Sequence, residues 1–186
     1  MKKIFLAATI IFTAATVTFA QNNSNAKQVK MERTELRKEV RKEHRLENRS
    51  EVSDLTKTQF AIDFPGATNV HFGKTSEFDV VSFTSGKRML RAYYDYEQEL
   101  VGTTQEKTFA DLPENAQKEI HKKYAGYSVD GVIKFDDNQS NETDMIMYGT
   151  SFDDADNYFV ELKNDSKAII VKVDLSGEVS FFKDMK

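Results

Sequence analysis

The chain has 186 residues, of which 30% are charged, a formal net charge of −4 and no cysteine. The lack of cysteine excludes a disulfide framework, a thiolate metal site and a thiol nucleophile, so stability must come from an ordinary apolar core. Residues 27–51 hold nine Lys or Arg and six Glu, whereas residues 52–186 hold fifteen basic and twenty-four acidic residues. Nucleic acid is therefore a poor partner for the body, because phosphate contacts need a positive surface.

The first twenty residues have the pattern of a secretory signal peptide. Lys2 and Lys3 precede an uncharged apolar run over Ile4–Ala15, and Thr18 and Ala20 are the small residues expected before a cleavage point. The run is too short to span a bilayer, and no cysteine follows it for lipid attachment. We expect a periplasmic or secreted protein that is not a lipoprotein and has no transmembrane segment in its mature chain. A retained N-terminal anchor is the alternative.

Residues 21–52 are predicted to form a charged arm. Its glutamates recur every four residues among Lys and Arg, a spacing that stabilises helices through ion pairs (Glu35, Glu39, Glu43, Glu47, Glu51). Its apolar residues form no continuous stripe, so little would hold it to a core. We predict a solvated tether, flexible or helical; the alternative is a basic arm that contacts an anionic envelope surface or a partner.

A first α+β unit is predicted over residues 53–110. Ser53 is a suitable N-cap for a short helix that contains Phe60 and ends at Pro65-Gly66. Four strand-like segments follow (68–72, 78–84, 88–94 and 99–104). Ser85-Gly86 between the second and third of these is typical of a hairpin turn.

A second α+β unit is predicted over residues 111–186. Asp111 is a suitable N-cap for a helix with Pro113 in its first turn and Gly126 at its end. Four residues at four-residue spacing give this helix an apolar face (Leu112, Ala116, Ile120, Tyr124). Five strand-like segments follow (127–135, 143–148, 158–162, 167–174 and 178–182). The acidic stretch 136–157 has the character of an insertion.

The two units match each other at an offset of 79 residues. The offset aligns Phe83 with Leu162 and Leu90 with Ile169, and it places Asp95 opposite Asp174 in the turn that follows. We therefore predict a tandem repeat of a short helix followed by an antiparallel sheet, an α+β fold.

Strand alternation separates two faces of this sheet. One face carries Leu90, Ala92 and Tyr94 and is expected to lie under the helices. The other face mixes aromatic, aliphatic and basic side chains, a composition that interfaces prefer, and is predicted to bind a partner (Met89, Arg91, Tyr93, Phe159, Lys172). Alternatively, the two units could fold their sheets together and bury this face.

Catalytic and metal-binding patterns are weak. His44, His71 and His121 have no metal-ligand spacing, and no serine lies in a nucleophile motif. We predict no catalytic residue, no cofactor and no metal site. The acidic segments 136–138 and 153–156 offer oxygen ligands for calcium but do not follow the order of an EF-hand, so solvated loops are favoured.

Several motifs resemble those of the β-lactamase-inhibitor-like, PepSY-like proteins, a family of exported bacterial proteins. The motifs are FPGATNVHF at 64–72, AYYD at 92–95, LPENAQKEIHKKYAGY at 112–127 and VDLSGEV at 173–179. The resemblance covers residues 55–186 and implies a sheet that presents a concave face to a protein. PepSY-like domains are associated with restraint of peptidases, and the namesake inhibitors bind β-lactamases. This chain departs from the pattern in two positions, since its first turn has Gln98 where the second has Gly177, and Phe72 stands where an aromatic residue, often Trp, is usual. It also lacks the disulfides of the true inhibitors.

These observations predict a non-enzymatic protein-binding module, an inhibitor or regulator of an envelope enzyme such as a peptidase. The alternative is a periplasmic sensor that binds a small ligand or calcium through the acidic loops.

Overall fold

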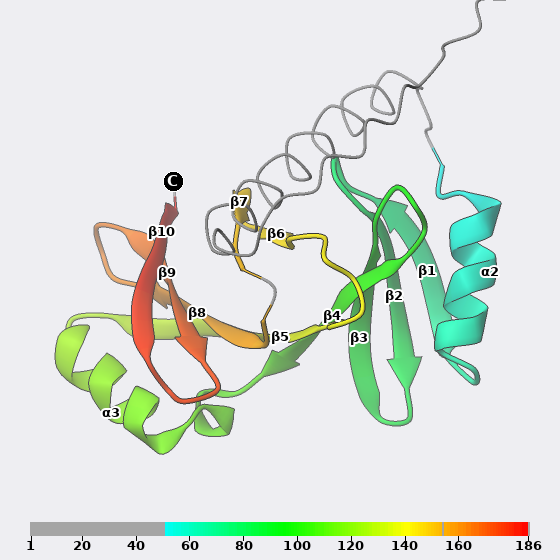
Figure 1. Ribbon diagram of the computed structural model, residues 1–186. Helices are drawn as coiled ribbons and strands as arrows, with labels where there is room; N and C mark the ends of the chain where they lie inside the picture. The colour runs from blue at the N-terminus through cyan, green and yellow to red at the C-terminus, as the bar shows by residue number, and fades with distance from the viewer. Residues whose placement is uncertain (1–50, 154, 186) are drawn as a thin grey trace, which may run out of the picture. The chain divides into compact units, whose positions relative to one another are not determined.

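The computed structural model describes residues 51–153 and 155–185, all of which belong to the second of two compact units, residues 43–186. The predicted signal peptide and nearly all of the predicted arm lie outside the described residues. The first helix and the four strands after it are α2 (Asp54–Asp63), β1 (Thr68–Lys74), β2 (Asp79–Ser85), β3 (Arg88–Tyr94) and β4 (Leu100–Lys107). The remaining elements are a 3-10 helix η1 (Phe109–Asp111), α3 (Glu114–Lys123), β5 (Ser128–Asp137), β6 (Ile146–Met147), β7 (Thr150–Ser151), β8 (Asn157–Lys163), β9 (Ala168–Asp174) and β10 (Val179–Met185) (Figure 1).

Eight of the strands form one antiparallel sheet in the order β1-β2-β3-β4-β5-β8-β9-β10. The β4–β5 pair, which runs from Gly102 opposite Asp137 to Lys107 opposite Val132, joins the first half of the sheet to the second. The two halves therefore meet edge to edge and do not fold onto each other. The register also pairs Phe83 with Leu90 and Leu162 with Ile169, the residues that the offset of 79 aligns. That the halves are internal repeats stays a prediction.

Both helices pack on the same predicted face of the sheet. The Ser53 hydroxyl accepts a hydrogen bond from the Thr56 N–H at 3.0 Å, which confirms Ser53 as the N-cap of α2. Phe60 of α2 then packs on the first half of the sheet (Val81, Phe83, Ala92, Tyr94). Ala116 and Ile120 of α3 pack on the second half (Val132, Val160, Leu162, Ile169, Val171, Val173, Val179). The predicted helix-covered face is confirmed.

Two predicted elements differ from the structure. Asp111 does not cap α3; its carboxylate instead accepts from the N–H and hydroxyl of Thr108 and closes η1, and α3 begins after Pro113. The predicted strand 143–148 is reduced to β6, which pairs only with β7 in a separate two-stranded sheet. Its alternating apolar residues signalled burial, but the burial is against the face of the main sheet and not within its hydrogen-bonded ladder.

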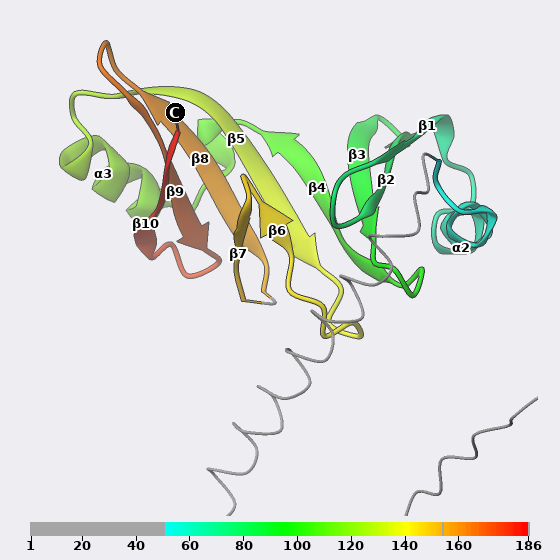
Figure 2. The ribbon, with the colours of Figure 1, turned by 90° about the horizontal axis from the view of Figure 1, so that it is seen from above.

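The described residues of the segment 138–156, between β5 and β8, cover the sheet face opposite α3. Their apolar side chains pack with those of the second half of the sheet (Met145, Met147, Phe152 with Phe135, Phe159, Ile170). Figure 2 shows the β6–β7 hairpin lying across β5 and β8, and Figure 1 shows α3 on the other side of these strands. The second half of the sheet is thus covered on both faces.

The β3–β4 and β9–β10 turns share one hydrogen-bond pattern. Asp95 and Asp174 each accept at the backbone carbonyl from the residue three positions later and donate from the N–H to the carbonyl four positions later. Gly177 adopts φ +85°, and Gln98 takes the equivalent position at φ +64°. The glycine missing from the first turn is therefore replaced by a residue in the left-handed region, which is costly for a side chain with a Cβ atom.

Gly102 is predicted to stabilise the β4–β5 pair because it has no side chain. A Cβ atom there would lie 2.6 Å from the Asp136 carbonyl oxygen and 2.6 Å from the Phe135 ring. We expect Gly102→Ala to lower the free energy of unfolding by about 1–3 kcal/mol, because the strands must separate or the ring must shift. The control is Gly73→Ala on β1, where the nearest atom would lie at 3.9 Å. Urea denaturation of both variants tests this, and equal midpoints would contradict it.

Candidate functional site

The candidate site is the part of the sheet face that neither the helices nor residues 138–156 cover. We call it the sheet-face patch, formed by five residues of the first half (His71, Met89, Arg91, Tyr93, Glu106). Cross-strand partners point to the same face, and Ser82 is opposite both His71 and Arg91. Met89 is 70% exposed, and His71, Arg91 and Glu106 are also exposed. The patch therefore combines an apolar side chain, an aromatic ring and both signs of charge on rigid strands.

Tyr93 lies where the patch meets the covered half of the sheet. Its ring packs edge-on against Phe78 with centroids 6.1 Å apart, and its hydroxyl is 3.3 Å from that of Thr104. Next to it, Tyr148 of the hairpin donates a hydrogen bond to Glu161 at 2.7 Å. Burial raises the pKa of Tyr148, and the bond to Glu161 raises it further. The border of the patch is thus formed by two half-buried tyrosines.

The structure divides the five residues that the sequence predicted for partner binding. Met89, Arg91 and Tyr93 lie together on β3 in the patch. Phe159 and Lys172 lie opposite each other on β8 and β9, in the second half of the sheet.

Phe159 is fully buried and does not lie on an exposed face, contrary to expectation. Its ring contacts Phe152 with centroids 4.9 Å apart and Phe182 at 5.0 Å. The sequence of the insertion could have indicated this burial, since the apolar run Met145–Met147 and Phe152 lie within a largely polar segment.

Asp95 fastens the covering segment to the sheet. One carboxylate oxygen accepts from the N–H groups of Glu97 and Glu99 at 2.9 and 3.0 Å. The other accepts from the Asn141 amide and the Thr143 hydroxyl, both at 3.1 Å. All three side chains of this link are buried, with Asp95 only 3% exposed. A buried carboxylate with four donors holds residues 138–143 against the β3–β4 turn.

Two of the acidic residues that calcium binding would use are engaged in other interactions. Asp136 forms an ion pair with Lys134, and an Asp156 carboxylate oxygen accepts from the Asp137 N–H at 2.8 Å. Burial, followed by the nearby Asp156 charge, raises the pKa of Asp137. Asp154 lies outside the described residues.

Among the described residues, one acidic group has the spacing of metal ligands. Carboxylate oxygens of Asp95, Glu97 and Glu99 all lie within 4.8 Å of one another. His71 on β1 and His121, which packs on Phe109, do not belong to it. His44 lies outside the described residues.

Comparison with solved structures identifies the fold. A DUF2874 family protein from Bacteroides uniformis matches with a TM-score of 0.58 at 12% sequence identity, over 72% of this chain and 89% of that chain. A BLIP-like protein from Bacteroides fragilis matches with a TM-score of 0.55 at 15% identity, over 72% and 86%. A Bacteroides eggerthii protein assigned provisionally to the periplasm matches with a TM-score of 0.58 at 11% identity, over 72% and 88%.

These matches confirm the predicted resemblance at the level of fold, which is that of BLIP-like and DUF2874 family proteins. No protein family matches the sequence, and no curated protein does.

The link through Asp95 generates a stability prediction. We expect Asp95→Ala to lower the free energy of unfolding by about 2–4 kcal/mol, because it leaves buried donors of the turn and of Asn141 and Thr143 without an acceptor. The matched control is Asp174→Ala, since Asp174 accepts from the Ser176 hydroxyl and the Glu178 N–H in the equivalent but exposed turn. Thermal denaturation followed by circular dichroism measures both, and a larger loss for Asp174→Ala would contradict the assignment.

Proposed function

We propose that this protein is an exported, non-enzymatic binding module that contacts a protein partner through the sheet-face patch. We further propose that the partner is an envelope enzyme such as a peptidase, which the module inhibits or regulates. The observation that carries the proposal is the exposure of Met89 beside Arg91 on the sheet face that residues 138–156 leave open.

The composition of the patch supports binding of a protein. Arg and Tyr are enriched among residues that dominate binding energies, and an exposed methionine supplies adaptable apolar contact. The side chains of Met89, Arg91 and Tyr93 stand on β3, which pairs with β2 along its whole length and with β4 from Leu90 onward, so little backbone entropy would be lost on binding. A half-buried Tyr93 is already ordered by Phe78 and Thr104, which lowers the cost further.

Location outside the cytoplasm is supported by two observations. The N-terminal segment has the pattern of a signal peptide. One protein of the same fold has been assigned provisionally to the periplasm. In the part of the chain that the structure describes, no helix is both long enough and apolar enough to cross a bilayer.

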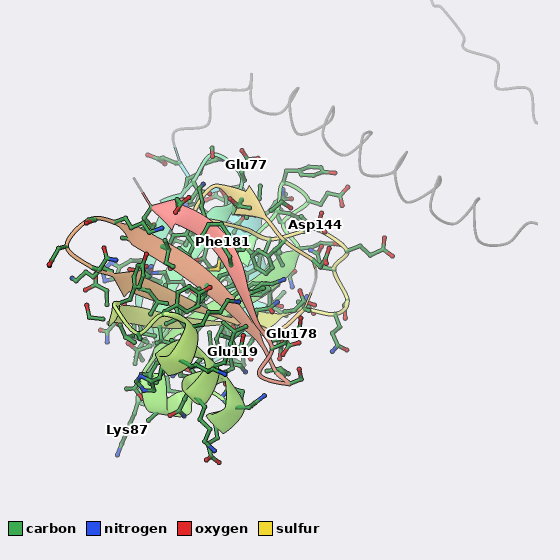
Figure 3. The ribbon with its side chains drawn as sticks, turned by 90° about the vertical axis from the view of Figure 1, so that its left-hand side faces the viewer. Glu77, Lys87, Glu119, Asp144, Glu178 and Phe181 are labelled. Atoms are coloured by element: carbon green, nitrogen blue, oxygen red, sulfur yellow. The ribbon has the colours of Figure 1, made fainter. Side chains whose placement is uncertain are left out.

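A pull-down with patch variants tests the proposed surface. We expect Met89→Glu with Arg91→Glu to abolish capture of a specific envelope protein by the tagged chain, since it replaces an apolar contact and reverses a charge. The control is Phe181→Glu with Lys122→Glu, which makes the same chemical changes at exposed residues on β10 and α3 (Figure 3 labels Phe181). Mass spectrometry identifies the captured protein, and capture that survives the patch variant while folding is intact would refute this surface.

A calcium sensor is the second candidate, favoured by the spacing of Asp95, Glu97 and Glu99. Against it, both oxygens of the Asp95 carboxylate already accept hydrogen bonds. We expect no calcium binding at this site. Calcium at millimolar concentration should therefore leave the midpoint of thermal unfolding unchanged, whereas a ligand that binds only the native state raises that midpoint. A saturable rise in the midpoint, abolished by Glu97→Gln with Glu99→Gln, would favour the sensor.

A further inference from the structure

A second surface lies at the end of the sheet where the β3–β4 and β9–β10 turns are found. Two hollows of about 750 and 570 Å³ adjoin there and share Asn141 in their linings. The larger lies between α2 and the β3–β4 turn, and the smaller between the start of residues 138–156 and the β9–β10 turn. We call these two hollows together the rim groove.

The rim groove is negatively charged along its length. None of the described residues that line it is Lys, Arg or His. Besides Glu142, six acidic residues line it (Asp63, Glu97, Glu99, Asp137, Asp156, Asp174). Glu97 and Glu99 are exposed and form no ion pair with a described residue. The Asp95 carboxylate accepts from the backbone N–H groups of both, and carboxylate oxygens of the two glutamates lie within 4.8 Å of each other.

The groove also has apolar walls. Leu55 of α2 is 67% exposed at the larger hollow, and Leu175 is 57% exposed at the smaller one. Exposed leucines beside a row of carboxylates complement a chain that alternates apolar and cationic side chains. A lone metal ion would use neither the leucines nor a hollow of this size.

We propose that the rim groove binds an extended segment of a partner protein that carries Lys or Arg between apolar residues. The rim groove and the sheet-face patch are formed by different residues, so an experiment can refute one proposal without refuting the other. Lysine and arginine side chains suit it because their apolar stems can lie on Leu55 and Leu175 while their charged ends reach the carboxylates.

Fluorescence anisotropy with a defined probe tests this proposal. The probe is a short labelled peptide of alternating lysine and leucine, titrated in EDTA with the protein that lacks only its predicted signal peptide. We expect saturable binding that Glu97→Gln with Glu99→Gln weakens about tenfold, as the loss of two ion pairs implies. Leu55→Ser is expected to weaken binding several-fold through lost apolar contact. A peptide with glutamate in place of lysine should not bind.

The matched control is Asp165→Asn with Asp184→Asn, which removes the same charge from exposed positions outside the groove. It should leave the affinity within about twofold, because exposed charges far from the bound peptide are screened by salt. Equal weakening by both double variants would overturn the proposal, as would absence of saturable binding. Full binding by Leu55→Ser would also overturn it, since attraction between charges would then suffice. Met89→Glu with Arg91→Glu should retain probe binding, which separates this result from the proposed function.

Discussion

The pairing of β4 with β5 is the interaction on which the rest of the structure depends. It joins two four-stranded halves into one sheet, so that α2 and α3 pack on the same face and the opposite face becomes continuous. The pairing is close because Gly102 has no side chain where the Phe135 ring lies. The two helices cover one face of this sheet, and apolar side chains on the opposite face, among them Phe135, Phe159 and Ile170, also have to be covered. This requirement gives the segment between β5 and β8 its structural role.

That segment covers the second half of the open face, packs with Phe78 and Val101 of the first half, and leaves Met89 and Arg91 exposed. Met145, Met147 and Phe152 pack with Phe135 of β5 and Phe159 of β8, which are both fully buried. Apolar burial alone does not fix the position of such a loop, because it is not directional. Directional hydrogen bonds do, and Asp95 supplies them by linking the β3–β4 turn to Asn141 and Thr143. The carboxylate that shapes the turn therefore also sets the border of the exposed patch.

The two proposed binding surfaces differ in physical character. The sheet-face patch is a strand-based surface of mixed polarity, suited to a folded protein that offers a complementary face. The rim groove is hollow, acidic and partly apolar, and it is built from turns and from one side of α2. Its charge has the sign expected from the sequence, in which residues 52–186 carry a clear acidic excess.

The sequence by itself determined the eight strands of the main sheet, the helix-covered face, the Ser53 cap and the antiparallel α+β class. These features are local, since the period of two and the capping chemistry are set by neighbouring residues. Only the tertiary structure decided that Phe159 is buried and that 143–148 forms no strand of the main sheet, because both depend on where residues 138–156 pack. Asp95 was visible as a turn residue, but its contacts with Asn141 and Thr143 span more than forty positions. Contacts at such distances have no local period in the sequence, and they decide which part of the predicted face stays exposed.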